Sequence, residues 1–168
     1  MQAHPEPAAV LDGLLEWGVK GSLYEYVSAM SGEIVATGAA VIAPNSHFNF
    51  PLVEQSRTDG AGGGIILKFA GGVRFRAHQG LMEIAFDDPW IEMDSVGYRL
   101  SAVYGGVSER SVLADLAHAE PELRDRESRW DGVPAQLAYT GAVLFDFRYA
   151  QGHELDPVSY YYVGEDAL

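Results

Sequence analysis

The apolar positions near the N-terminus recur at a helical spacing. Between residues 10 and 30 they fall close to a period of 3.6 residues: Leu11, Leu14, Leu15, Val19, Leu23, Tyr26 and Val27. Gly18 and Gly21 interrupt this pattern, and a glycine costs a helix interior about 1 kcal/mol. We therefore expect a break at the glycines and the firmest helix over residues 20–30.

After Gly32 the pattern changes to the two-residue period of strands. In the clearest hairpin, alternating Leu67 and Phe69 precede a turn at residues 70–72, and alternating Val73 and Phe75 follow it. Further strands are expected at residues 33–42, 48–52, 81–87, 90–93, 98–104, 111–119, 136–147 and 158–163. Turn-forming residues occupy 43–46 and 121–134, and residues 58–64 predict a flexible loop. This order predicts a mainly β fold, an antiparallel β-sandwich or barrel-like domain with one N-terminal α-helix.

The composition narrows the organisation and the function. The 168 residues fit one domain, with a flexible arm at residues 1–9 and a single domain over 10–168. The absence of cysteine removes thiolate metal sites and thiol nucleophiles. Eleven basic against 24 acidic residues, a net charge of −13, argue against nucleic-acid binding. No signal peptide or 18-residue apolar run is seen, so we expect a cytoplasmic protein, or a secreted or cell-surface one if the sequence has been trimmed.

Two tyrosines in the predicted helix point in different directions. At about 100° per residue, Tyr24 and Tyr26 lie nearly on opposite faces. Tyr26 then aligns with Ser22, Gly18 and Leu14, each four residues apart. Two small residues leading to a large one would form a shallow seat for a flat ligand beside a phenol.

A phenol at such a seat has two readings. Most tyrosines pack their ring and bond their hydroxyl at the edge of a core. Alternatively, phenolate oxygen is a hard anionic donor and can be an axial ligand of haem. The proton of a phenol leaves only near pH 10, so such a site needs a nearby positive charge and a hydrogen-bond partner. His78 is a candidate partner, on the far face or at the end of the 73–77 strand, although spacing alone does not pair it with Tyr26.

Four segments together resemble a known family. WGVKGSLYEYV at 17–27, FNFP at 48–51, IILKFAGGVRFRAHQGLMEIAFDDPWIE at 65–92 and YAQGHELDPV at 149–158 are similar to the HtaA-type haem-binding domains of actinobacterial haem uptake. The resemblance implies a mostly antiparallel β fold with a few short helices, ferric haem b as cofactor, and a haem donor or acceptor protein as partner. It implies Tyr26 as the axial ligand, His78 as the hydrogen-bond partner of its phenol, and Ser22 in the pocket. Ala77 stands where the family usually has glycine.

Other functions stay open on the sequence. The main expectation is haem uptake, transfer or storage. A haem-dependent peroxidase-like enzyme would need a distal acid–base group, for which His47 and His118 are the unassigned candidates. A biosynthetic enzyme that binds another flat hydrophobic substrate in the former haem pocket, or a plain interaction domain, are further alternatives. The chain has no nucleophile elbow, P-loop or dinucleotide-binding glycine motif, and its histidines lack metal-binding spacings.

Overall fold

The computed structural model describes residues 11–58, 63–104 and 109–164, so the arm predicted at residues 1–9 lies outside the described residues. In chain order the elements are β1 (Gly13–Trp17), α1 (Gly21–Ala29), β2 (Glu33–Thr37), β3 (Val41–Ile42), β4 (Phe48–Thr58), β5 (Gly64–Phe69), β6 (Gly72–Ala77), the 3-10 turn η1 (His78–Gly80), β7 (Met82–Met93), β8 (Tyr98–Tyr104), β9 (Arg110–Leu116), β10 (Glu122–Arg124), β11 (Glu127–Leu137), α2 (Tyr139–Leu144) and β12 (Glu154–Val163). None of the described helices has the length and apolarity needed to cross a bilayer.

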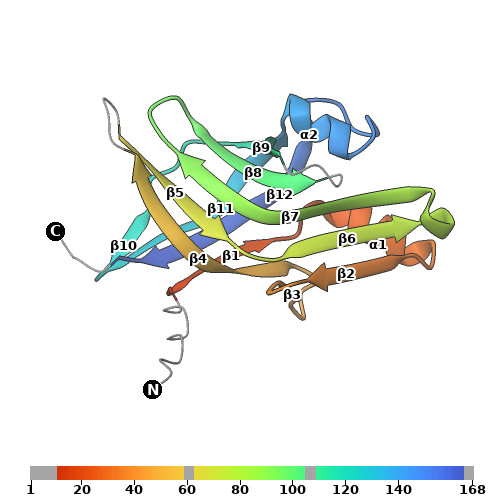
Figure 1. The fold of residues 1–168 in the computed structure, drawn as a ribbon, viewed down its shortest axis with the longest axis horizontal. Coiled ribbons are helices and arrows are strands. Elements are labelled where there is room, and N and C mark those ends of the chain that lie inside the picture. The colour runs from red at the N-terminus through yellow and green to blue at the C-terminus, as the bar shows by residue number, and fades with distance from the viewer. Residues whose placement is uncertain (1–10, 59–62, 105–108, 165–168) are drawn as a thin grey trace, which may run out of the picture.

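Eight antiparallel strands close into a barrel (Figure 1). The ring runs β7-β5-β4-β1-β12-β11-β9-β8, and the pairing of β8 with β7 closes it. Beyond the ring, β6 and then β2 extend the sheet from β7, while β3 pairs with β4 and β10 with β11. The predicted mainly β fold with one N-terminal helix is therefore confirmed, and of the two architectures named it is the barrel.

Strand β7 belongs to both the barrel and the extension. Its residues 82–87 pair with β6, whereas residues 90–93 pair with β5 in the ring. Between these halves the pairing with β8 shifts its register, and Asp88 has a φ of 51°. An irregularity of this kind bends a strand and increases its twist. The strands predicted separately at 81–87 and 90–93 are thus one bent strand.

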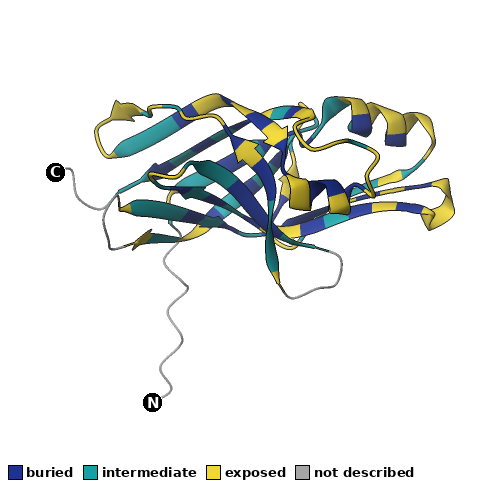
Figure 2. Ribbon diagram, turned by 90° about the horizontal axis from the view of Figure 1, so that it is seen from above, coloured by how far each residue is buried: buried dark blue, intermediate teal, exposed yellow. Residues whose placement is uncertain are grey.

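The barrel interior is filled with aromatic and aliphatic side chains. Buried and exposed positions alternate along the strands (Figure 2), as the two-residue period requires. The largest fully buried side chains are Trp17, Tyr160, Phe48, Phe50, Phe69, Phe75, Phe86 and Phe145. Each buried aromatic of this size contributes roughly 1.5–3 kcal/mol relative to exposure, so the ring is a packed core rather than an open channel.

The helix predicted to begin near residue 10 is wrong for its first half, because residues 13–17 form strand β1. Leu15 and Trp17 point into the barrel with no exposed surface, and the Trp17 indole N–H donates to the Asp156 carbonyl at 2.8 Å. Leu14 lies on the other face of the strand and is only partly buried. Apolar residues on both faces of one strand imitate the helical period, which explains the error.

Four further segments differ from the sequence expectation. The hairpin predicted around residues 70–72 is wrong, because β5 and β6 do not pair with each other and instead pair with different halves of β7. Residues 33–42 form two strands, β2 and β3, because the chain turns at Gly38, whose φ is 60°. The polar segment 121–134 is the β10–β11 hairpin rather than a turn region. Within 136–147 only the end of β11 is strand, and α2 follows. Gly141 permits that helix, because an added Cβ would lie 2.1 Å from the Leu113 carbonyl oxygen.

Candidate functional site

Helix α1 is anchored at both of its ends, to β12 of the barrel at its start and to β6 of the extension at its end. Leu23 and Val27 are buried and form its inner face. At its start, the Asp156 carboxylate on β12 accepts the Gly21 N–H at 3.0 Å, which satisfies a donor that the helix leaves free. At its end, Gly32 lies so close to β6 that an added Cβ would be 2.3 Å from the Arg76 carbonyl oxygen. The direction of every α1 side chain is therefore fixed.

The two tyrosines of α1 lie on different sides, as predicted. Tyr24 is partly buried and its ring lies 6.4 Å from that of Phe48. Tyr26 is 41% exposed, and Ser22 is exposed one turn earlier on the same side. Since α1 begins only at Gly21, the row predicted from Leu14 through Gly18 is not helical, and only Ser22 and Tyr26 remain of it.

His78 lies at the tip of the β6–β7 hairpin, at the strand end where one of the two expectations placed it. His78, Gln79 and Gly80 have successive φ values of 53°, 58° and 89°. Left-handed backbone is uncommon for a residue with a side chain, and it persists where the surrounding structure enforces it. This turn sends the imidazole away from the hairpin and towards α1.

The structure brings Tyr26 and His78 together across 52 residues of chain. The Tyr26 Oη lies 2.6 Å from the His78 Nε2, and the ring centroids are 5.9 Å apart. With a neutral imidazole protonated on Nδ1, the phenol donates its proton to Nε2. If the phenol loses that proton to Nε2, the same atoms form an Nε2–H donor facing a phenolate. The pair can thus hold the oxygen in either protonation state.

The pair lies on an open surface with apolar side chains beside it. Met30 on the last turn of α1 is 48% exposed, and Leu81 after η1 is 90% exposed. Residues 30–33 and 76–80 line a hollow of about 420 Å³ between the helix end and the hairpin tip. Arg76, which is among these, forms an ion pair with Glu83 at 3.4 Å. Ala77 is 2% exposed and belongs to the core face of β6, so its methyl packs inward.

The remaining candidate histidines lie elsewhere. The His47 Nδ1–H donates to Glu16 at 2.9 Å, in a pocket that also contains Tyr24, on the opposite side of α1 from Tyr26. Hydrogen bonds from Asn45 and His47 lower the pKa of the Glu16 carboxyl. His118 lies outside β9 beside Glu120, at 3.0 Å. The structure therefore places neither histidine where it could act on a group bound at Tyr26.

Some contributors to this site were missed from the sequence. Asp156 lies in the YAQGHELDPV segment, yet its role in capping α1 from the far end of the chain had no local signal. For Gly32 the sequence offered one signal that was not used: a glycine just after a predicted helix indicates a close approach or a cap. Among the residues that the structure describes, no three side chains of His, Asp or Glu are arranged to hold a metal ion.

Comparison with proteins of known structure shows the same fold. The C-terminal domain of HtaA from Corynebacterium glutamicum superposes with a TM-score of 0.78 at 20% identity, covering 92% of this chain and 97% of that one. The N-terminal domain of the same protein superposes with a TM-score of 0.72 at 19% identity, covering 92% of this chain and 97% of that one. The heme-binding protein HtaB of that organism superposes with a TM-score of 0.67 at 17% identity, covering 90% of this chain and 92% of that one.

Sequence comparison identifies the family. No curated protein sequence matches the chain. The profile of the HtaA family, however, matches residues 12–161, a span that includes α1, the β6–β7 hairpin and β12. The match extends over most of the described structure, and the chain accordingly belongs to the HtaA family.

Proposed function

We propose that this protein binds ferric haem b, with the Tyr26 phenolate as axial ligand, His78 as the hydrogen-bond partner of that oxygen, and Ser22 as a polar contact. The observation that carries the proposal is the exposed Tyr26 Oη, held 2.6 Å from His78 Nε2 on an anchored helix. Membership of the HtaA family and the fold shared with a heme-binding protein support it.

The residues present fit a haem group. Tyr26 supplies a hard oxygen donor, which suits a ferric ion and is a known axial ligand type. The described residues give the phenol one hydrogen-bond partner and leave its ring 41% exposed, so a flat group can approach it. Met30 and Leu81 offer exposed apolar contact to the side of the pair. The bound iron would supply the positive charge that favours phenolate over phenol.

His78 would serve as the proton acceptor at this site. Its Nε2 is already in contact with the hydroxyl, so the phenol proton has a place to go without crossing solvent. After that transfer, Nε2–H would donate to the phenolate and stabilise its negative charge. Such a partner would favour the phenolate form of Tyr26 as the ligand.

The surface position of Tyr26 favours transfer or uptake over permanent retention. A ligand on an exposed helix face of the extension, outside the packed barrel, leaves a bound haem accessible to another protein. We therefore extend the proposal to exchange of haem with a donor or acceptor protein. Neither His47 nor His118 adjoins Tyr26, so neither of these two candidates favours the peroxidase-like alternative.

The test is a titration of the haem-free protein with haemin, followed by absorbance. Tyr26→Phe removes only the hydroxyl and should abolish the tyrosinate-type spectrum and weaken binding at least tenfold. His78→Ala should leave the tyrosinate-type band but weaken haemin binding, because the ligating oxygen loses its hydrogen-bond partner. Tyr24→Phe is the matched control, because it removes a hydroxyl from the same helix on the other side.

Two outcomes would contradict the assignment. Equal spectra and affinity for Tyr26→Phe and the native protein would show that the iron is held elsewhere. An equal loss in Tyr24→Phe and Tyr26→Phe would attribute the effect to the helix rather than to the ligand. Circular dichroism and size-exclusion chromatography of each variant establish that it is folded and in the native oligomeric state.

A further inference from the structure

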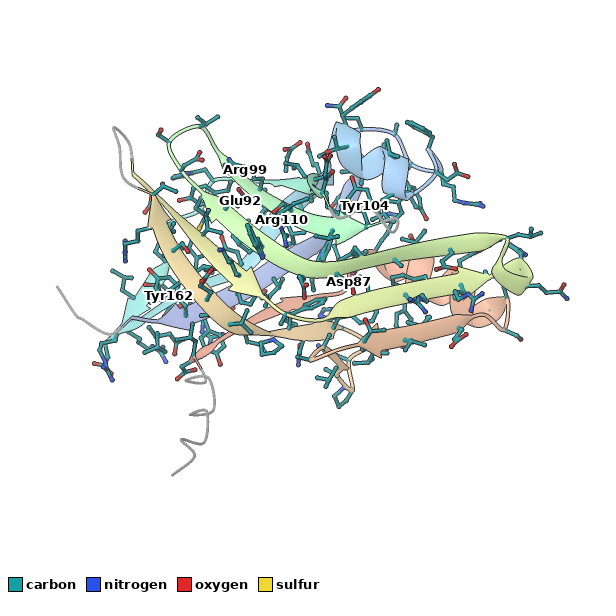
Figure 3. All side chains as sticks on the ribbon, viewed as in Figure 1. Asp87, Glu92, Arg99, Tyr104, Arg110 and Tyr162 are labelled. Atoms are coloured by element: carbon teal, nitrogen blue, oxygen red, sulfur yellow. The ribbon has the colours of Figure 1, made fainter. Side chains whose placement is uncertain are left out.

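The barrel has a second pocket at the end opposite α1. It lies beside the end of β4, the start of β5, the β7–β8 turn and the segment between β9 and β10, and it has a volume of about 600 Å³, within the range of small-molecule sites. In Figure 1 this is the end at which β10 lies, whereas the β6–β7 hairpin reaches to the other end of the molecule. Figure 3 shows Tyr162 at this end. Barrel mouths are among the common places for such sites.

The mixed lining of this mouth pocket includes a group of aromatic and apolar side chains. Trp130 and Tyr162 are stacked, with ring centroids 6.1 Å apart and an interplanar angle of 18°. Tyr98 forms another part of the wall, and burial raises the pKa of its phenol. Met93 and Ile65 complete the apolar lining. Flat faces of this kind favour a flat partner.

Two polar side chains of β4 lie on its inward face, with Gln55 partly buried and Arg57 exposed at the mouth. In the β4–β5 register, Arg57 pairs with Ile65 and Gln55 with the fully buried Leu67, so both point inward. Arg57 lines the mouth pocket. Gln55 lies one step deeper, and its Oε1 is buried without a hydrogen-bond partner among the described residues. An unpaired buried amide oxygen costs stability, which a bound donor would offset.

The charges around the mouth leave one cation available. The Asp94 carboxylate is engaged by Arg99 at 2.7 Å and by two backbone N–H groups. His118 is paired with Glu120. Arg57 forms no hydrogen bond or ion pair with any residue in the described ranges. A guanidinium in a partly closed aromatic pocket is a strong site for a carboxylate or sulfonate.

We propose that the mouth pocket is a second ligand site, which takes a flat aromatic anion smaller than haem. The aromatic body would lie against Trp130, Tyr162 and Tyr98, its acid group would pair with Arg57, and a donor on the ligand would reach Gln55. This site shares no residue with the Tyr26–His78 pair, so it is independent of the proposed haem function.

Equilibrium dialysis with anilinonaphthalene sulfonate tests the proposal. The native protein should bind one probe, with the same affinity after loading with haemin. Arg57→Ala should weaken binding about tenfold, the loss expected for one charge-assisted hydrogen bond. The matched control is Arg124→Ala, which removes the same charge from the same end of the barrel, outside the pocket. The uncharged analogue N-phenylnaphthylamine should bind more weakly and equally to native protein and Arg57→Ala.

Each opposing result overturns the inference. Absence of saturable binding to the folded native protein would show that the pocket takes no such anion. Displacement of the probe by haemin, or loss of probe binding in Tyr26→Phe, would show that the probe binds at the α1 surface instead. Equal probe affinities of the native protein and Arg57→Ala would show that Arg57 does not bind the acid group of the probe. A failure of haem binding with normal probe binding would refute only the proposed haem function.

Discussion

The close approach of α1 to β6 at Gly32 allows a test of how the site is positioned. In Gly32→Ala, the new methyl would lie 2.3 Å from the Arg76 carbonyl oxygen, 2.7 Å from a Val27 methyl and 2.9 Å from the Val27 carbonyl oxygen. Two of these atoms are backbone and cannot turn aside. To reach an ordinary contact of about 3.4 Å, the end of α1 must move away from β6 by about 1 Å. Overpacking of this kind costs about 1–3 kcal/mol in the free energy of unfolding.

The same movement should reach the candidate ligand. The Tyr26–His78 separation of 2.6 Å leaves little room, and an additional 1 Å would exceed the range of a good hydrogen bond. Loss of a hydrogen bond to a charged group corresponds to roughly a 10- to 100-fold change in affinity. We therefore expect Gly32→Ala to bind haemin at least tenfold more weakly than the native protein, although neither Tyr26 nor His78 is changed.

The assay combines urea unfolding with haemin titration. Gly21→Ala is the matched control, because the same substitution at the other end of α1 places a methyl 3.5 Å from the Asp156 carboxylate, an ordinary contact. It should keep haem affinity and match or exceed native stability. An unfolding free energy of Gly32→Ala equal to the native value would refute the steric reasoning. Lower stability with unchanged haem affinity would refute the idea that the α1–β6 contact positions the pair.

Three further predictions concern stability. Hydrogen bonds from Arg99 lower the pKa of Asp94 to about 2 from 3.8, so the stabilising effect of this carboxylate is complete above about pH 4 and is lost as the pH falls towards 2. When the free energy of unfolding is measured against pH, Asp94→Asn should differ from the native protein near neutral pH and converge with it below pH 2. Burial raises the pKa of the Tyr160 phenol, so its stabilising effect is complete below about pH 10 and is lost above it. In an alkaline titration followed by absorbance, Tyr160 should ionise only when the protein unfolds, and this absorbance step should be missing in Tyr160→Phe. Trp17→Phe should lower the free energy of unfolding in urea by about 2–4 kcal/mol, because it opens a cavity and removes the hydrogen bond from the indole to the Asp156 carbonyl. A decrease of less than about 1 kcal/mol would contradict this packing role.

The strands were predictable where one face of each is buried and the other exposed. β5 and β6 have this alternation, and their bounds match the strands predicted around residues 65–69 and 73–77. They do not form the predicted hairpin, because β5 pairs with β4 and β7 whereas β6 pairs with β2 and β7. β1 lacks it, because Leu14 and Leu11 add apolar surface outside the barrel. α2 contains threonine and valine, which favour strands, and its helix depends on the close contact between Gly141 and Leu113. Such distant contacts override local preference and have no signal in the local sequence.

The candidate site was predictable in its parts rather than in its assembly. Helical spacing placed Ser22 and Tyr26 on one face, and the alternation in β6 placed His78 on the far face of the strand or at its end. Their meeting depends on the left-handed turn at residues 78–80 and on the packing of α1 against β6. Neither is a property of nearby residues, so the resemblance to a family supplied the pairing that spacing left open.

The order of the strands also constrains how the chain folds during synthesis. β1 pairs with β12, from Gly13 opposite Tyr162 to Trp17 opposite Val158, so nearly the whole chain separates the two strands that join here. Such non-local pairing is slow to form, and the ring cannot close until the ribosome has released the last strand. Asp156 on that strand also caps α1. A nascent chain therefore presents Tyr26 on an anchored helix only after β12 has left the ribosome, which delays ligand capture until the barrel is able to retain its shape.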